Sequence, residues 1–342
     1  MVVDIHTHTF PERIAASTIQ KLQDISHTRP FTDGTEAGLR ASMVAAGVDF
    51  SLVLPVATSP RQVVHINDAS ARLNSQGNGI LSFGCMHPDF DGWKEELGRV
   101  AALGMKGIKV HPVYQGVDFD DPRYLRILDR CGELGLIVLT HAGLDIGFPG
   151  QVNCSPEMVL RAVEQAGPLQ LILAHMGGWR NWDQVEELLP HTHVYLDTAY
   201  ALGRIAHRGD GHFAPEELAL MSKAQFLRMV DTFGAHRILF GTDSPWSGQQ
   251  ESLERFRALR IDEPFDMIVA IADGGILPAG ILCRKLGLPV YLLRLNLRDE
   301  CQNKLYDRPK LLRPIDFDFA GKRVLLVEDR IKTGTTVRYA KE

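Results

Sequence analysis

The sequence predicts an α/β protein: a (β/α)8, or TIM, barrel over most of the chain, followed by a smaller, incomplete parallel α/β module. Three observations predict this. Eight apolar, strand-like runs alternate with helical patterns over about 250 residues, the usual size of such a barrel. Histidine, lysine and aspartate residues stand at the ends of several of these runs. A shorter second series of strands and helices begins after residue 262.

The eight predicted strands are Met1–His8, Phe50–Ala57, Ile80–His87, Gly107–His111, Leu136–His141, Leu169–His175, His193–Asp197 and Arg237–Asp243. Between them, Pro122–Leu134 and Pro156–Gly167 have apolar residues at helical spacing and proline in the first turn. Gly135 and Gly167 stand where these two helices should end. A doubly wound open sheet fits the same alternation, but it does not account for the polar residues at the strand ends.

The composition is that of an ordinary globular protein, with 45% hydrophobic and 23% charged residues in a chain of 342. No apolar run is long enough to span a bilayer, and Asp4 and His6 interrupt the start too early for a signal peptide. The five cysteines are scattered and odd in number, which favours reduced thiols. We therefore expect a cytoplasmic protein. The absence of a long basic run argues against nucleic acid as a partner, and a homo-oligomer is left open.

The first predicted strand ends in the motif His6-Thr7-His8. Side chains alternate between the two faces of a strand, so both imidazoles point the same way, with Asp4 one step deeper. Two imidazoles placed in this way can hold one metal ion, at about 2.0–2.1 Å from zinc. Because a His-x-His pair is common by chance, the motif predicts a metal site only if other ligands come to the same place.

Such ligands end other predicted strands. Lys109 and His111 end the fourth strand, His141 the fifth, His175 the sixth and Asp243 the eighth. In a (β/α)8 barrel the C-terminal ends of all strands meet at one rim, where the chemistry takes place. The apolar runs alone define these strands, so the common placement of the polar residues is independent evidence for a site. A single buried histidine is more often structural, but a whole set at one rim favours function.

Five motifs, in this order, resemble the amidohydrolase superfamily, and most closely its group related to aminocarboxymuconate-semialdehyde decarboxylase. They are Asp4-Ile5-His6-Thr7-His8, Gly107-Ile108-Lys109-Val110-His111-Pro112, Thr140-His141-Ala142-Gly143, Ala174-His175-Met176-Gly177-Gly178 and Phe240-Gly241-Thr242-Asp243-Ser244-Pro245-Trp246. The resemblance covers residues 1–260, which we expect to form the first domain.

The resemblance implies a metal-dependent hydrolase with one divalent ion, for which zinc is the expected metal. His6, His8, His141 and Asp243 would bind it, and His175 would orient or deprotonate the water that the metal activates. Zinc lowers the pKa of a bound water to about 7, and the Asp243 carboxylate can accept a proton. The substrate would be a small molecule with an amide, ester or lactone carbonyl. The alternative is non-oxidative decarboxylation, by a lyase that uses the same metal site.

Lys109 is expected to take part in catalysis in one of two ways. In some amidohydrolases the lysine of the fourth strand is carboxylated and bridges two metals. Otherwise its ammonium would pair with a substrate carboxylate or a neighbouring group, which is the reading we favour. Loops after barrel strands commonly shape a substrate pocket, and the candidates there are Tyr114, Trp179, Arg180 and Trp246. Arg180 could hold a carboxylate, while the aromatic rings could equally cover the edge of the barrel.

Residues 263–342 form the second predicted domain, after a linker at Asp262-Glu263-Pro264. The predicted strands are Phe265–Ala272, Val290–Leu295 and Arg323–Val327, with a helix over Leu277–Leu286. The last strand leads into residues 328–336, Glu-Asp-Arg-Ile-Lys-Thr-Gly-Thr-Thr, which resemble the phosphoribosyl-pyrophosphate motif of type I phosphoribosyltransferases. That family usually has five core strands, so about 80 residues predict an incomplete domain.

In this motif Glu328 and Asp329 can accept hydrogen bonds from the hydroxyl groups of a ribose. The turn formed by Thr333, Gly334, Thr335 and Thr336 would offer N–H and hydroxyl groups to a phosphate at a helix N-terminus. The resemblance therefore implies binding of phosphoribosyl pyrophosphate with magnesium, as an alternative function of the chain. The alternative is that the second domain is a remnant that binds no ligand.

Overall fold

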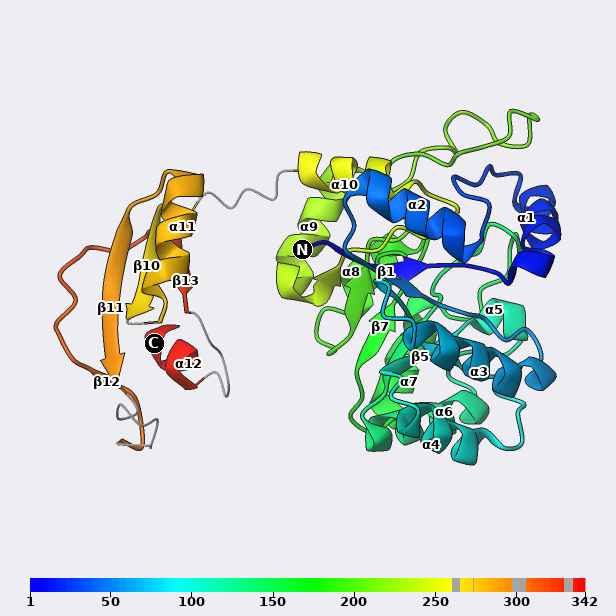
Figure 1. Cartoon of the computed structure of the whole chain (residues 1–342), viewed down its shortest axis with the longest axis horizontal. Coiled ribbons are helices and arrows are strands. Elements are labelled where there is room, and N and C mark those ends of the chain that lie inside the picture. Colours follow the sequence, from blue (N-terminus) through cyan, green and yellow to red (C-terminus); the bar gives the residue numbers. More distant parts are fainter. Residues whose placement is uncertain (260–264, 273, 297–305, 329–334, 342) are drawn as a thin grey trace. The chain divides into compact units, whose positions relative to one another are not determined.

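A computed structural model describes residues 1–259, 265–272, 274–296, 306–328 and 335–341. The chain divides into two compact units, Met1–Arg260 and Ile261–Glu342, and each is described by itself (Figure 1).

The strands of the first unit form two parallel arcs. One arc holds β1 (Val3–Thr7), β2 (Phe50–Val53) and β3 (Ile80–Ser82). The other holds β4 (Gly84–Cys85), β5 (Gly107–Val110), β6 (Ile137–Thr140), β7 (Leu171–Leu173), β8 (Tyr195–Asp197) and β9 (Ile238–Leu239), in chain order.

Backbone hydrogen bonds join the two arcs into a closed barrel. The N–H of Ile5 donates to the carbonyl of Phe240 (3.0 Å), and that of Asp243 to the carbonyl of His6 (2.8 Å). At the other junction the N–H of Phe83 donates to the carbonyl of Val53 (3.1 Å), so β3 and β4 are one predicted strand with a local break. The predicted TIM barrel is therefore confirmed.

Helices that follow the successive strands surround the barrel (Figure 1). They are α2 (Glu36–Ala46), α3 (Val63–Asn74), α4 (Trp93–Ala102), α6 (Pro122–Leu134), α7 (Pro156–Gln165), α8 (Trp182–Leu188), α9 (Lys223–Phe233) and α10 (Gln249–Ala258). Two further helices, α1 (Glu12–Ser26) and α5 (Pro112–Gln115), lie in the connections after β1 and β5, and short 3₁₀ turns occupy Pro60–Gln62 and Ala235–Arg237. The predicted ends of α6 are confirmed: the Asp121 side chain accepts from the N–H of Arg123, and Gly135 has φ 66°.

The barrel has an inner and an outer apolar layer. Buried side chains of alternate strand positions, such as Leu54, Leu139 and Ile172, form one cluster with Ile5 and Leu239. The side chains at the positions between them face the helices and belong to the large outer cluster. Because of this alternation, side chains at the C-terminal ends of the strands point toward the barrel axis. The polar residues of the predicted site stand at these positions.

Asp4 departs from the expected alternation. Its carboxylate accepts hydrogen bonds from the Thr242 N–H (3.0 Å), the Thr242 hydroxyl (2.6 Å) and Gln249 Nε2 of α10 (2.8 Å). The register of β1 against β2 shifts between Asp4 and Thr7. Because of this irregularity, Asp4 and His6 do not lie on the same face of the strand although they are two residues apart. Asp4 therefore ties β1 to the end of β9 and to α10, and the expectation that it lies beneath His6 on the same face is wrong.

The second unit is a four-stranded sheet in the order β12-β11-β10-β13. Strands β10 (Met267–Ala272), β11 (Val290–Asn296) and β13 (Val324–Val327) are parallel, as predicted, while the short β12 (Lys310–Leu311) is antiparallel and was not anticipated. Helix α11 (Ile276–Leu286) packs on one face of β10 through Ala279, and α12 (Thr335–Lys341) packs on the other through Val337. Among the described helices of both units, none has the length and apolar character needed to cross a membrane.

Replacement of Asp4 tests the closure of the barrel. We expect Asp4→Ala to lower the free energy of unfolding by about 3 kcal/mol or more, because it leaves several buried donors unpaired. Urea unfolding followed by tryptophan fluorescence reports on this unit alone, since all 4 tryptophans belong to it. The exposed Glu95→Ala of α4 is the control and should stay within about 0.5 kcal/mol. An Asp4→Ala variant as stable as this control would contradict the role given to Asp4.

Candidate metal centre

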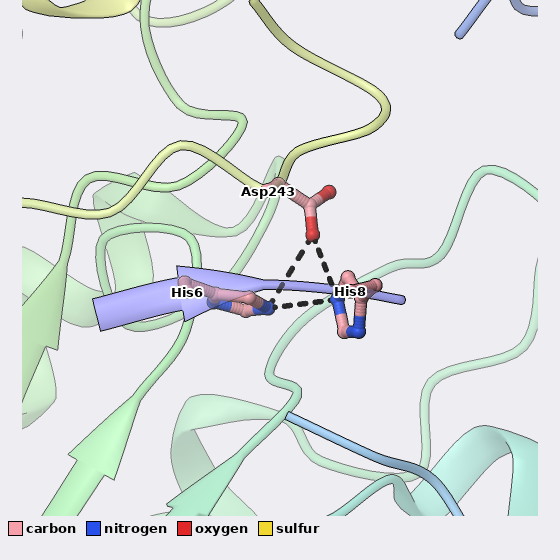
Figure 2. A group of neighbouring side chains, drawn as sticks. All are labelled: His6, His8 and Asp243. Carbon is pink, nitrogen blue, oxygen red and sulfur yellow. Dashed lines mark hydrogen bonds and ion pairs between the residues drawn. The ribbon is translucent and has the colours of Figure 1, made fainter. Parts of the chain in front are cut away.

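Two histidines and an aspartate meet at the C-terminal rim of the barrel, where β1 lies beside the end of β9 (Figure 2). His6 Nε2 lies 3.2 Å from His8 Nε2, and Asp243 Oδ1 lies 3.3 Å from the first nitrogen and 3.1 Å from the second. Ligands held about 2.0–2.1 Å from a tetrahedral zinc ion lie roughly 3.3 Å apart. The triangle therefore has the size that a metal ion requires.

The other ring nitrogens of these histidines are held by oxygen atoms. His6 Nδ1 contacts Asp197 Oδ2 at 2.8 Å, and His8 Nδ1 contacts the carbonyl of Leu54 at 2.9 Å. A carbonyl or an ionised carboxylate only accepts hydrogen bonds, so both Nδ1 atoms carry the hydrogen. In the neutral rings both Nε2 lone pairs then face Asp243 and each other. Metal-binding histidines usually have such a partner on the second nitrogen.

His141 and His175 repeat this arrangement next to the triangle. His141 Nε2 donates to the carbonyl of Leu144 (3.0 Å), and His175 Nδ1 donates to the carbonyl of Ala199 (2.8 Å). The remaining nitrogens, His141 Nδ1 and His175 Nε2, are 3.1 Å apart. In neutral rings these are two facing lone pairs, which repel unless a proton or a metal cation lies nearby. The ring of His175 is 5.3 Å from that of His6, centroid to centroid.

The pKa values of these histidines and of Asp243 agree with a binding site for a metal cation. Burial lowers the pKa of His6 and His141 well below the ordinary value, and it also lowers the pKa of His175, which keeps all three rings neutral. Burial by itself would raise the pKa of Asp243, but its short contact with His8 Nε2 and the positive charge that the nearby histidines can carry lower it to about 2. Neutral imidazoles around an ionised carboxylate are the protonation state in which a metal binds.

A cavity of about 1420 Å³ opens beside these groups. Lys109 lines it although its side chain is only 1% exposed, and no ion pair to its ammonium is found among the described residues. Burial lowers the pKa of Lys109 to about 8, although Asp197 and Asp243 act in the opposite direction. The cavity therefore contains a buried cation with room for an anionic group beside it.

A second cluster, His111, His141 and Asp145, also lines the cavity. Asp145 Oδ2 lies 3.6 Å from His111 Nε2 and 3.7 Å from His141 Nε2, and burial raises the pKa of Asp145 to about 6. However, the Nε2 of His141 donates to Leu144 and so has no lone pair for a metal. This chemistry favours the His6, His8 and Asp243 triangle as the metal site.

The structure brings most of the predicted site residues together. Tyr114, Trp179 and Trp246, which were expected to contact substrate, line the same cavity as Lys109 and the histidines. Arg180 is not among the lining residues, and its guanidinium donates to the carbonyl of Glu217 and lies over the Trp179 ring. His141 lies outside the tight triangle, with its Nδ1 turned to His175.

The sequence did not predict three residues of the site. Asp197 ends the predicted strand His193–Asp197, and its position at a strand end was the available signal. Asp145 and Tyr200 belong to the loops after β6 and β8, and both line the cavity. Nothing in their sequence context separates them from other loop residues.

In the second unit only part of the predicted phosphoribosyl motif is described. Glu328 follows β13, and Thr335 and Thr336 begin α12. Asp329, Thr333 and Gly334 lie outside the described residues.

The fold and the rim residues together define an enzyme of the TIM-barrel class. The family model described as amidohydrolase matches residues 3–267, so the chain belongs to this family. A second model, the phosphoribosyl transferase domain, matches residues 252–342.

Solved structures with the same barrel include a 2,6-dihydroxybenzoate decarboxylase in complex with 2,6-dihydroxybenzoate. It is 18% identical with a TM-score of 0.53, over 77% of this chain and 95% of that chain. An uncharacterised TIM-barrel protein from Bordetella bronchiseptica is 17% identical with a TM-score of 0.57, over 77% and 92%. A 5-carboxyvanillate decarboxylase from Novosphingobium aromaticivorans, complexed with manganese, is 14% identical with a TM-score of 0.54, over 75% and 90%. At these identities the likeness establishes the fold alone.

Among curated proteins, the chain is 28% identical over 125 residues to an orotate phosphoribosyltransferase from Pyrobaculum islandicum. The match takes in 33% of this chain and spans 61% of the length of that relative. It supports a phosphoribosyltransferase-like second unit.

The metal site can be tested by elemental analysis of the purified full chain. We expect a divalent metal that is lost in the double variant His6→Ala/His8→Ala, because two ligands are removed. The chain offers a matched control in His191-Thr192-His193, the same tripeptide in which both histidines are exposed. The variant His191→Ala/His193→Ala should keep its metal. Equal loss in both variants, or no loss in either, would contradict the site.

Proposed function

We propose that the barrel is a single-metal enzyme that acts on a small carboxylic acid and removes the carboxylate as carbon dioxide. The observation that carries the proposal is the set of inward-facing lone pairs around Asp243, next to the Lys109 ammonium, which has no ion pair within the described part of the chain. The expected zinc remains one candidate beside manganese, which a structural neighbour binds.

His6, His8 and Asp243 are proposed to hold the metal, with His141 and His175 completing its surroundings. When bound, a divalent cation would attract substrate oxygen and stabilise negative charge. Asp197 and the carbonyls of Leu54 and Ala199 orient the imidazoles through their second nitrogens.

Lys109 is proposed to bind the substrate carboxylate as an ammonium. Its side chain is buried, so a carboxylate beside it would form a charge-assisted hydrogen bond in a setting of low dielectric constant. His175 Nε2, which has no hydrogen of its own, can accept a proton in the cavity. When the carboxylate leaves as carbon dioxide, the carbon that carried it takes up a proton, and Asp145 on the opposite side of His141 is the group proposed to supply that proton.

Decarboxylation is the first candidate reaction because several proteins that share this barrel are decarboxylases of hydroxylated or methoxylated benzoates. Hydrolysis of an amide, ester or lactone is the second candidate, since the family is that of the amidohydrolases. In that reaction His175 is proposed to activate the attacking water. Both reactions use the same metal and differ in the bond that breaks.

A substrate screen separates the two reactions. Incubation of the metal-loaded chain with carboxyl-labelled aromatic and enoic acids should release labelled carbon dioxide, and His6→Ala/His8→Ala should abolish the release. Lactones and amides should be left intact. Turnover of lactones or amides without carbon dioxide would contradict the decarboxylase proposal in favour of hydrolysis.

The charge of Lys109 predicts a pH dependence. The ammonium is present below its pKa of about 8 and is lost above it, so kcat/KM for an acid substrate should fall as the pH rises through 8. Lys109→Arg should keep activity at higher pH, because guanidinium stays charged. Lys109→Met should lower kcat/KM by roughly 10- to 100-fold.

Lys106→Met is the control, since Lys106 is exposed at the other end of the same strand. A flat profile to pH 10, with two metals per chain and activity restored by bicarbonate, would instead indicate a carboxylated Lys109.

For the second unit we propose magnesium-dependent binding of phosphoribosyl pyrophosphate through the segment that begins at Glu328. The phosphoribosyl transferase model and the orotate phosphoribosyltransferase relative support this. Calorimetric titration of the full chain should detect binding that requires magnesium and is weakened by Glu328→Ala, with Asp307→Ala as the control. Absence of binding at millimolar ligand would contradict the proposal.

A further inference from the structure

The cavity beside the metal centre continues along helices α1 and α3. Ile14, Lys21 and Ile25 of α1 line it, as do Ile66 and Leu73 of α3, and their spacing of four or seven residues places them on one side of each helix. We refer to this part of the cavity as the outer groove. The whole cavity of about 1420 Å³ exceeds the roughly 300–1,000 Å³ that holds an ordinary small ligand, so a single-ring acid would leave the outer groove empty.

The two ends of α1 mark the two ends of the outer groove. At the inner end, a β-carbon added to Gly147 would lie 3.4 Å from Ile25 and 3.2 Å from Asp145, so Ile25 lies beside the loop that carries Asp145. At the far end, the N–H of Phe10 donates to the carbonyl of Gly34 (2.7 Å). The start of α1 therefore lies beside the segment that leads into α2.

Two arginines line the far end of the outer groove. Arg13 belongs to the first turn of α1, about 18 Å along the helix axis from Ile25 at 1.5 Å per residue. Arg72 belongs to the last turn of α3, and Gln76, just after that helix, donates to Glu36 at the start of α2 (3.4 Å). Both guanidinium groups thus belong to helix ends that lie near the start of α2.

These cations have no protein partner of their own. Within the ranges that the structure describes, neither arginine has an ion pair or a side-chain hydrogen bond, and the same holds for Lys21. By contrast, Arg99 and Arg123 each hold two carboxylates at 2.7–2.8 Å. The cations of the outer groove are therefore available to a ligand.

The acidic side chains of the outer groove, Glu12 and Glu36, do not neutralise these cations. Glu36 is bound by Arg40 (3.0 Å), and Glu12 stands in the first turn of α1, where the helix dipole stabilises a negative charge. The barrel unit as a whole has 23 lysine and arginine residues against 30 aspartate and glutamate residues. An excess of cations in this wall is therefore a local feature, and it favours an anionic ligand.

We propose that the outer groove makes the barrel select an elongated acid with an anionic group at each end. The reacting carboxylate lies at Lys109, and the far group, a carboxylate or a phosphate, lies at Arg13 and Arg72, since guanidinium pairs well with both. Ile14 and Ile25 are 38% and 44% exposed, so an apolar chain that joins the two groups covers them. The inference rests on the proposed function, in which Lys109 holds the reacting carboxylate.

Acids of two lengths test this in calorimetric titrations of the metal-loaded full chain. Dodecanedioate and 12-phosphonododecanoate should bind about 10-fold more tightly than dodecanoate, because an exposed ion pair adds roughly 2- to 5-fold in affinity and two arginines take part. The tighter of the two probes identifies the far group as a carboxylate or a phosphate. Succinate is too short to reach the arginines, so its affinity relative to butanoate should not depend on them.

The double variant Arg13→Ala/Arg72→Ala should reduce the preference for the long two-headed acids to about 2-fold, with the affinity for dodecanoate unchanged. The control Lys94→Ala/Arg257→Ala removes two exposed cations of α4 and α10 that do not line the cavity, and it should keep the preference. The ratio of succinate to butanoate affinity should be the same in both variants.

Equal binding of the three long probes to the wild type would overturn the inference, and this result does not depend on the folding of a variant. A preference that persists in Arg13→Ala/Arg72→Ala would overturn it as well. If no acid binds, or if Lys109→Met leaves the affinity for dodecanoate unchanged, the proposed function fails and this inference fails with it. Dodecanoate binding that depends on Lys109, without a preference for the two-headed acids, leaves the proposed function intact.

Discussion

The carboxylate of Asp197 connects three strands of the barrel at the site. One oxygen accepts from Nδ1 of His6 on β1, and the other accepts from the backbone N–H groups of His175 and Ala199, after β7 and β8. All of these atoms are buried, so each bond forms where water cannot compete. The orientation of the His6 ring and the path of two loops therefore depend on a single side chain.

This arrangement determines which way the imidazoles face. Each of the four histidines near Asp243 gives one ring N–H to an oxygen of the protein, and so presents its other nitrogen to its neighbours. Without a metal, the facing lone pairs and the buried Asp243 carboxylate would be unfavourable neighbours. A divalent cation resolves both problems together, which is why the local chemistry points to a metal and not to a set of structural histidines.

Much of the fold and of the candidate metal site could be predicted from the sequence. The strands follow from apolar runs, and the rule that strand ends meet at one rim then brings His6, His8, Lys109, His175 and Asp243 together. The structure agrees, with the third strand broken at Phe83 and the rest in order. In the second unit, the parallel strands and helix α11 also lie where the apolar pattern predicts them.

The remaining features depend on backbone geometry that no local pattern encodes. A register shift turns Asp4 away from His6 and toward α10, although spacing alone predicts a common face. Asp145 and Tyr200 reach the cavity because of loop conformations that include positive φ angles at Gly143 and Tyr200. Asp197 looked like an ordinary strand end, since its importance comes from partners 22 and 191 residues away.

The protonation of the histidine rings shows most directly whether the imidazole lone pairs around Asp243 face a common metal. Long-range proton–nitrogen NMR of the chain with labelled histidine reads the tautomer of each ring directly. We predict Nδ1–H tautomers for His6, His8 and His175 and an Nε2–H tautomer for His141, and addition of zinc or manganese should perturb Nε2 of His6 and His8. Protonation of those inward nitrogens in the neutral rings, or spectra unchanged by either metal, would contradict it.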